Sequence, residues 1–299
     1  MKGLKSLFIF LKGMAMGAAD VVPGVSGGTI AFISGIYDPL LHSINAINFS
    51  LFKTLKAEGV KGVWKSINGP FLLLLFAGIA TSVISLAKLL STLLETQPIA
   101  LWSFFFGLIL ASIVLVWKPI VHTNKWLTVL FSGIGFASAL YISLLNPLPE
   151  ATSLAYLFFS GALAICAMIL PGISGSFILV LLGSYPTVLN AVHERNLGVL
   201  LVVGAGAVFG LLSFSKLLKW LFEHFKNATL TILVGFIAGS LPKIWPWKVA
   251  TELGLNLYLP SFKTREDQLF TGLLFMGLGL SLVLLLETLG NATKNKSAS

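Results

Sequence analysis

Charged residues and cysteine are scarce in this sequence. Only 10% of its 299 residues are charged, 56% are hydrophobic, and the mean hydropathy is +0.93. Soluble domains carry about 25% charged residues, so this composition excludes an ordinary soluble enzyme or binding module. It predicts a polytopic membrane protein. The single cysteine, Cys166, excludes an intrachain disulfide.

The sequence also lacks the motifs of common catalytic and metal sites. It has no phosphate-binding loop with its lysine, no His-Glu metal pattern and no nucleophile paired with a base. We therefore expect no enzyme activity, no metal and no cofactor. The formal charge of +9 comes from basic residues scattered singly over many loops. This distribution argues against nucleic-acid binding and indicates membrane orientation instead.

One polar interruption of an apolar segment is present twice. The first break, residues 23–29, reads Pro-Gly-Val-Ser-Gly-Gly-Thr, and the second break, residues 171–176, reads Pro-Gly-Ile-Ser-Gly-Ser, 148 residues later. Gly35 matches Gly183 at the same offset. Because proline and paired glycines disfavour a continuous helix, each segment is predicted to be two half-helices that meet at a break.

The start of a helix presents unpaired N–H groups and a partial positive charge, which suit an anion. Broken segments at corresponding positions of two repeats are typical of a transporter's binding site. The alternative is a purely structural role, in which the hydroxyl side chains cap helices and the glycines break them without contacting a ligand. On the first interpretation the breaks hold a phosphate through Pro23, Gly24, Ser26, Gly27, Gly28, Thr29, Pro171, Gly172, Ser174, Gly175 and Ser176.

The order of apolar segments predicts an all-α membrane protein of two repeats, residues 1–150 and 151–299, that form one membrane domain. Each repeat has one broken or re-entrant hairpin followed by three spans of about 20 residues. The broken segments are 7–41 and 154–190, and the spans are 71–94, 99–117, 127–145, 198–221, 228–245 and 268–287. The later helices match at an offset of 128, as Gly107 and Gly235 do.

The first repeat has an extra basic segment, residues 50–68, in which apolar residues alternate with Lys53, Lys56, Lys61 and Lys65. The pattern is typical of an interfacial helix on an anionic inner leaflet. Two glycines weaken that interpretation, and a plain basic loop remains the alternative.

Lysine and arginine counts predict the orientation in the membrane. With both termini cytoplasmic and each broken segment returning to its own side, 14 of the 20 basic residues are cytoplasmic. Each repeat then makes an odd number of net crossings, so the second is inverted relative to the first. The count does not distinguish eight crossings from ten.

Asp20 lies three residues before Pro23 in an apolar run. A carboxylate near the bilayer centre costs about 2.5–3.5 kcal/mol, so it should face a cavity, pair with another group or hold a proton. Two interpretations stay open: Asp20 binds a coupling ion or proton, or it caps backbone groups freed by the break. Its counterpart in the second repeat is Met168, so either role belongs to one half.

The combination of these motifs resembles a known family. Gly17-Ala18-Ala19-Asp20, the first break, Gly35-Ile36-Tyr37 and the second break are similar to the bacterial polyprenyl-phosphate transporter family over essentially the whole chain. The resemblance implies a plasma-membrane protein that returns undecaprenyl phosphate, the lipid carrier of cell-wall sugars, from the outer to the inner leaflet. The headgroup would sit between the breaks while the prenyl tail stays in the bilayer.

Undecaprenyl-pyrophosphate phosphatase also has broken helices with a Pro-Gly-x-Ser motif, followed by an arginine and accompanied by paired glutamates. Here Gly27 and Gly175 occupy the arginine position, and no Glu-x-x-x-Glu pattern is present. This difference favours transport over hydrolysis. The alternatives are a transporter of a small soluble anion and, second, a membrane phosphatase; a structural scaffold would not explain two costly breaks. The sequence does not indicate an oligomeric state.

Overall fold

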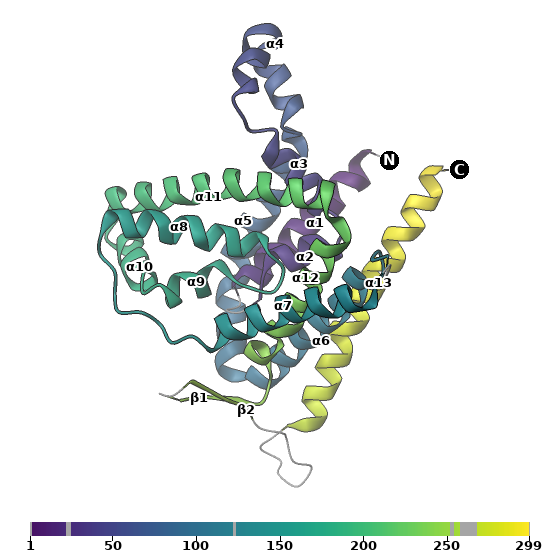
Figure 1. Ribbon diagram of the computed structural model, residues 1–299, viewed down its shortest axis with the longest axis vertical. Helices are drawn as coiled ribbons and strands as arrows, with labels where there is room; N and C mark the ends of the chain where they lie inside the picture. The colour runs from purple at the N-terminus through teal and green to yellow at the C-terminus, as the bar shows by residue number, and fades with distance from the viewer. Residues whose placement is uncertain (1, 22–24, 122–123, 252–253, 258–267, 299) are drawn as a thin grey trace.

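A computed structural model describes residues 2–21, 25–121, 124–251, 254–257 and 268–298. Helices dominate these residues (Figure 1). In chain order they are α1 Lys2–Val21, α2 Gly27–Ile33, α3 Tyr37–Asn45, α4 Ser50–Ser66, α5 Gly69–Thr96, α6 Pro98–Trp117, α7 Lys125–Leu144, α8 Leu154–Ile169, α9 Gly175–Leu181, α10 Tyr185–His193, α11 Leu197–His224, α12 Lys226–Ser240, the 3-10 helix η1 Leu241–Ile244 and α13 Leu269–Ala298.

Local sequence accounts for where the long helices begin. Pro70 and Pro98 occupy the first turns of α5 and α6, where a missing N–H removes no helical hydrogen bond. The Asn124 side chain accepts hydrogen bonds from the Trp126 and Leu127 amides at the start of α7. The Asn196 side chain likewise caps α11. These caps satisfy N–H groups that have no partner within the helix.

Every expected span coincides with a helix. Five helices, α5, α6, α7, α11 and α12 with η1, contain stretches long and apolar enough to cross a membrane. The apolar part of α13, Leu269–Leu285, is shorter, although its helix continues to Ala298. The bent pair α9 and α10, which meet at 114°, would make a sixth candidate if counted as one span. The chain is therefore a multi-pass membrane protein.

The helices pack in matching pairs. In the first half α1 packs on α5, and in the second α8 packs on α11; between the halves, α6 packs on α13 and α7 on α12. Glycines make the close approaches at equivalent places. A Cβ on Gly78 would lie 2.2 Å from the Phe10 carbonyl oxygen, and one on Gly206 would lie 1.9 Å from that of Phe158. Gly78 and Gly206 are separated by the offset of 128, and Phe10 and Phe158 by the offset of 148. Residues matched in the sequence therefore make matching contacts between helices.

Two elements interrupt this correspondence. The basic segment forms α4, whose Gly59 has a non-helical backbone with φ of 66°; the plain-loop alternative is therefore wrong. Helix α4 projects from the body as two helical pieces (Figure 1). In the second half, β1 Lys248–Thr251 pairs antiparallel with β2 Gly254–Leu257, with Lys248 opposite Leu257.

An ion pair joins the C-terminal end of α6 to the middle of α13. The Lys118 ammonium lies 2.7 Å from a carboxylate oxygen of Glu287. Nearby, the Asn227 side chain exchanges two hydrogen bonds of 3.3 Å with the backbone of Val121. The contact between Val121 and Asn227 joins two segments that the charge count places on the cytoplasmic side of the membrane.

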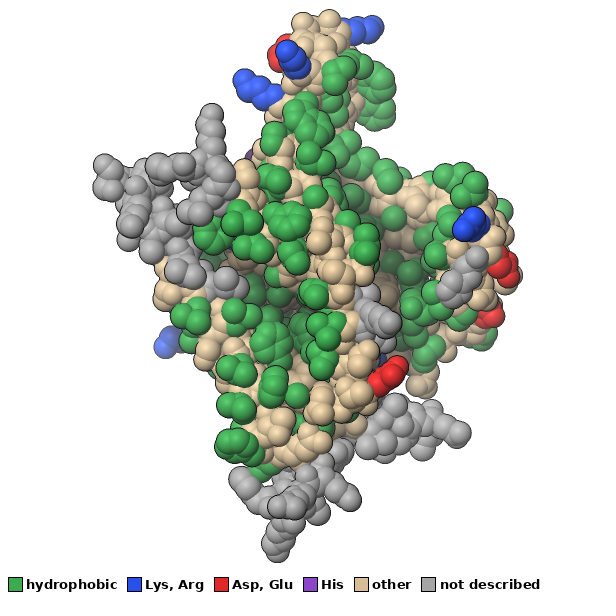
Figure 2. All heavy atoms as spheres, turned by 180° about the vertical axis from the view of Figure 1, so that it is seen from behind, with side chains coloured by type: hydrophobic (Ala, Val, Ile, Leu, Met, Phe, Trp, Pro, Cys, Tyr) green, Lys and Arg blue, Asp and Glu red, His purple; other side chains and the backbone are tan. Residues whose placement is uncertain are grey.

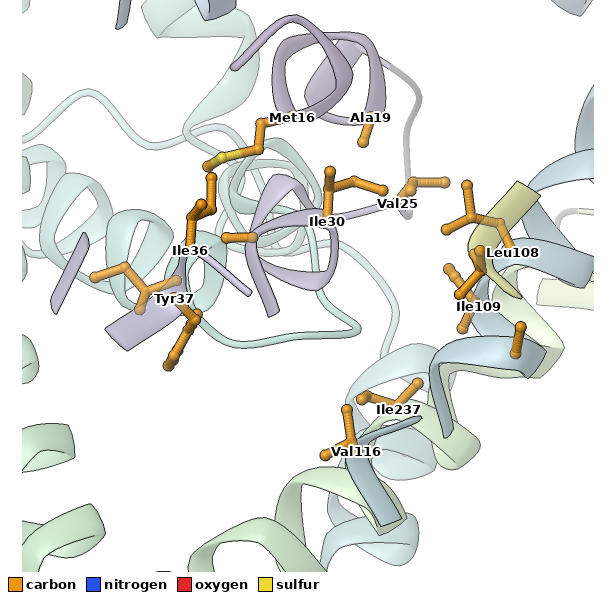
Figure 3. Packing of buried hydrophobic residues seen from close by; sticks show 14 of the residues in the cluster. Met16, Ala19, Val25, Ile30, Ile36, Tyr37, Leu108, Ile109, Val116 and Ile237 are labelled. Atoms are coloured by element: carbon orange, nitrogen blue, oxygen red, sulfur yellow. The ribbon is translucent and has the colours of Figure 1, made fainter. Parts of the chain in front are cut away.

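The core lies where the first break meets α6. Val25, Ile30 and Ile109 are buried there, together with Ile237 of α12, and Figure 3 shows Val25 directed toward Leu108 and Ile109. Apolar side chains also cover much of the outer surface (Figure 2). An apolar exterior around a packed interior is what a lipid environment requires.

Candidate functional site

Both segments break where the sequence predicts. Helix α1 ends at Val21 and α2 begins at Gly27, while α8 ends at Ile169 and α9 begins at Gly175. Pro23 and Gly24 lie outside the described residues. Pro171 is fully buried, and Gly172 has φ of 101°, a left-handed conformation that glycine adopts without steric cost.

The short helices α2 and α9, which begin at the breaks, are both followed by the same kind of turn. Gly35 and Gly183, at φ of 71° and 63°, end α2 and α9. The Ile36 amide donates to the Ala31 carbonyl at 3.0 Å, and the equivalent Ser184 amide donates to the Leu179 carbonyl at 2.9 Å. The sequence match around the breaks therefore corresponds to a shared backbone structure.

The two breaks meet inside the protein. The Ser26 hydroxyl lies 3.1 Å from the carbonyl oxygens of Met168 and of Leu170. The Gly172 amide donates to the Thr29 hydroxyl oxygen at 3.1 Å. Polar groups of the first break thus satisfy backbone groups that the second break frees from helical hydrogen bonding.

The backbones of the two breaks approach so closely at Gly28 that only glycine fits there. A Cβ on Gly28 would lie 2.5 Å from the Ile169 carbonyl oxygen and 2.7 Å from that of Met168. Since both obstacles are backbone atoms, a side chain at this position would push the halves apart. A Cβ on Gly175 would similarly lie 2.7 Å from the Ala164 carbonyl oxygen.

Asp20 binds the start of α2 from the end of α1. One carboxylate oxygen, Oδ1, accepts a hydrogen bond of 2.8 Å from the Gly27 amide, while Ser26 accepts one of 3.1 Å from the Gly28 amide. The capping interpretation of Asp20 therefore has a geometric basis. The other oxygen, Oδ2, is buried and has no hydrogen-bond partner among the described residues, so this carboxyl keeps an unused site for a proton or cation.

The described residues of the first break, 25–29, are all buried. Ser26 and Thr29 are both 0% exposed. In the second break Ser174 is also buried, and its hydroxyl lies 2.7 Å from that of Ser176, which is partly exposed. A groove of about 430 Å³ lies between α4 and α11, lined by residues such as Phe52 and Lys216, but no break residue lines it.

The sequence patterns did not single out two lysines that lie near the second break. Lys243 of η1 lies over the Phe177 ring, 3.9 Å from its centroid, and Lys248 lies 3.4 Å from the centroid of Trp102. The Lys248 ammonium also donates to the Lys243 carbonyl. Their signal in the sequence is a pair of lysines on either side of two tryptophans, Lys243-Ile-Trp-Pro-Trp-Lys248, although the rings that the lysines contact lie on other helices.

No group of three His, Cys, Asp or Glu side chains suited to a metal ion occurs in the part of the chain that the structure describes. The polar atoms at the breaks are hydroxyls, backbone amides and one carboxylate. Amides and hydroxyls can donate to an anion, and the carboxylate can hold a proton.

Comparison with known proteins gives consistent matches. The family model described as undecaprenyl phosphate translocase-like matches residues 16–259. A protein of Vibrio cholerae named polyprenyl-phosphate transporter is 55% identical over 85% of this chain and 82% of its own. One of the same name from Staphylococcus aureus is 35% identical over 79% of this chain and 85% of its own. No solved structure matches the chain.

These matches confirm the resemblance drawn from the breaks. The family and both relatives are named for translocation or transport and not for hydrolysis, so the phosphatase alternative is dropped. The matched residues include both breaks and Asp20. The chain belongs to the undecaprenyl phosphate translocase-like family.

Proposed function

We propose that this protein moves polyprenyl phosphate, and undecaprenyl phosphate in particular, from the outer to the inner leaflet of the bacterial plasma membrane. The transport of polyprenyl phosphate is supported by the names of its relatives. The main structural support for a headgroup site at the breaks is that the two breaks meet at Ser26, Thr29 and Gly172. Such transport would recycle the carrier of cell-wall sugars.

The headgroup site proposed is the space that opens when the breaks separate. In the closed arrangement the hydroxyls of Ser26 and Thr29 serve the opposite break. A phosphate entering between them would offer acceptor oxygens to the Gly172 amide and to the freed hydroxyls. The prenyl tail needs no polar path, because it can stay in the bilayer through a lateral opening while the headgroup crosses.

The repeats are proposed to be inverted, so that the breaks approach the membrane centre from opposite sides. The matched packing of α6 on α13 and α7 on α12 supports two equivalent halves. The charge count supports the inversion and cytoplasmic termini. An alternating-access movement could then expose the same headgroup site to either leaflet in turn.

Inward movement of an anion opposes an inside-negative potential by about 2.3 kcal/mol per charge per 100 mV. Concentrative transport therefore needs a co-transported cation. We infer that a proton on Asp20 fills this role, since Oδ2 is buried and unpaired within the described structure. Protonation would neutralise the only carboxylate that contacts the first break among the described residues.

Headgroup translocation in proteoliposomes tests the proposal. A polyprenyl phosphate carrying a label whose accessibility differs between leaflets should cross the bilayer only when the protein is present. A pH gradient should make the crossing directional. If the protein moved inorganic phosphate and left the lipid in place, the alternative of a small-anion transporter would replace this one.

A further inference from the structure

Among the described residues, the side of the second break that faces η1 carries two lysines that form no ion pair with a carboxylate. Lys243 and Lys248 lie close enough that the Lys248 ammonium reaches the Lys243 carbonyl. The ion pairs of the described residues join Lys118 to Glu287 and Lys219 to Glu223, and neither involves these two lysines. Two neighbouring ammonium groups, with no carboxylate paired to them in the described part of the chain, are a local arrangement that an anion would stabilise.

The lysines are held in place by rings from other helices. Phe177, under Lys243, belongs to α9 and directly follows Ser176, whose hydroxyl contacts that of Ser174. Trp102, under Lys248, belongs to α6. Cation–π contacts of this kind contribute about 0.5–2 kcal/mol and keep an ammonium oriented without neutralising it. Both charges are therefore positioned beside the second break and remain available to a ligand.

The η1 turn is tied to the second break by packing. A Cβ on Gly172 would lie 3.1 Å from the hydroxyl oxygen of Ser240 and 3.2 Å from the Cα of Ile237. Ser240 is the last residue of α12 and immediately precedes η1. A movement of the second break would therefore also displace η1, the turn that contains Lys243.

We propose that Lys243 and Lys248 form a recognition site for the phosphate group of the transported lipid, beside the second break and positioned by Phe177 and Trp102. This inference rests on the proposed function. A phosphate monoester has three terminal oxygens, which can accept from both ammonium groups at once. The site would bind the headgroup at the entrance and pass it to the hydroxyls of Ser174 and Ser176 when the breaks separate.

The protonation of Lys248 supports the same assignment. Burial, and then the positive charge of Lys243, lower the pKa of Lys248 to about 7. The charged group against it among the described residues is Lys243, and the ring against it is Trp102 of α6. A bound phosphate would raise this pKa again, so binding takes up a proton. Affinity should therefore fall as pH rises above 7.

The test measures binding and translocation by the full-length protein with Lys243→Gln, Lys248→Gln and both together. The probes are a short-chain polyprenyl phosphate, the uncharged polyprenol and inorganic phosphate. Each removed lysine should weaken binding of the polyprenyl phosphate roughly tenfold, the value of one charge-assisted hydrogen bond. Lys226→Gln, at the exposed opposite end of α12, is the matched control and should bind like the unmodified protein.

Arginine variants keep the test valid if the glutamine variants fold poorly. Lys248→Arg retains its charge above pH 7, so its affinity should stay level between pH 7 and 8.5 while that of the unmodified protein falls roughly tenfold. Equal pH profiles of the two proteins would overturn the recognition role of Lys248.

The outcomes separate this inference from the proposed function. If the unmodified protein moves the lipid and the double glutamine variant binds it with unchanged affinity, the lysine site is wrong and the function stands. If binding requires the lysines but only inorganic phosphate binds, the site stands as a phosphate site and lipid transport fails.

Discussion

Individual polar side chains at the breaks hold the two halves together. Ser26 contacts two carbonyl oxygens of the opposite half, and Thr29 accepts from the Gly172 amide. Ser26, Thr29 and Gly172 are buried, and an unpaired hydrogen-bonding group in a buried position costs about 1–3 kcal/mol. Ser26 and Thr29, which the sequence predicts to bind the phosphate headgroup, therefore also hold the two halves together in the closed arrangement.

Replacing Asp20 by Asn separates capping from coupling. Asparagine keeps an oxygen that can accept from the Gly27 amide, the bond that Asp20 makes at 2.8 Å, but it cannot hold a transferable proton. We expect binding of polyprenyl phosphate to persist while uptake driven by a pH gradient is lost. Proteoliposome transport with and without the gradient measures this, and unchanged gradient-dependent uptake would reject the coupling role.

Replacing Thr29 by Val keeps the shape of the side chain and removes its hydroxyl. The Gly172 amide would lose its acceptor, and the unfolding free energy should fall by about 1–3 kcal/mol. Thr81→Val is the control, because the Thr81 hydroxyl is exposed and donates only to the Ala77 carbonyl of its own helix. Thermal unfolding of both variants in detergent compares them; equal melting temperatures would mean that this contact is not stabilising.

At the scale of elements, glycine decides how closely helices pack. The α8–α11 crossing lets Gly206 approach the Phe158 backbone so closely that a Cβ would lie 1.9 Å from a carbonyl oxygen. Close approach of this kind is a principal source of helix association in lipid, where apolar burial between helices gains little. The equivalent crossing of α1 and α5 uses Gly78.

Gly206→Val should therefore force α8 and α11 apart. We expect a loss of about 1–3 kcal/mol in stability from overpacking, with reduced transport because α8 leads directly into the second break. Gly204→Val, two residues earlier on α11, is the matched control, since a Cβ there meets nothing within 4 Å. The yield of monodisperse protein and its melting temperature report the difference. A similar loss in both variants would indicate helix propensity as the cause.

At the scale of the whole molecule, the helix pairs of the first half correspond to those of the second, and the departures from this correspondence are local. Helix α4 is added in the first half, and the hairpin of β1 and β2 is added in the second. In Figure 1 these additions lie at opposite ends of the molecule, and α1 begins and α13 ends on the side of α4. This arrangement agrees with additions on opposite membrane surfaces.

Cysteine labelling tests the orientation directly. In a Cys166→Ser background, a cysteine replacing Lys61 on α4 should react with an impermeant thiol reagent only from the cytoplasmic side. One replacing Asn146, in the loop between α7 and α8, should react only from outside; both positions are exposed. Labelling of both cysteines from one side would reject the inverted arrangement, since it would require an even number of crossings between them.

The amino-acid sequence by itself determined the membrane class, the positions of the breaks and the internal match, because proline, glycine and long apolar runs act on the chain locally. It also singled out Asp20, since a carboxylate in an apolar run is costly wherever the chain folds. Only the tertiary structure decided that Ser26 and Thr29 bind the opposite break and that Lys243 and Lys248 lie beside Phe177 and Trp102. Those contacts join residues from different helices, and no local propensity specifies which helices meet.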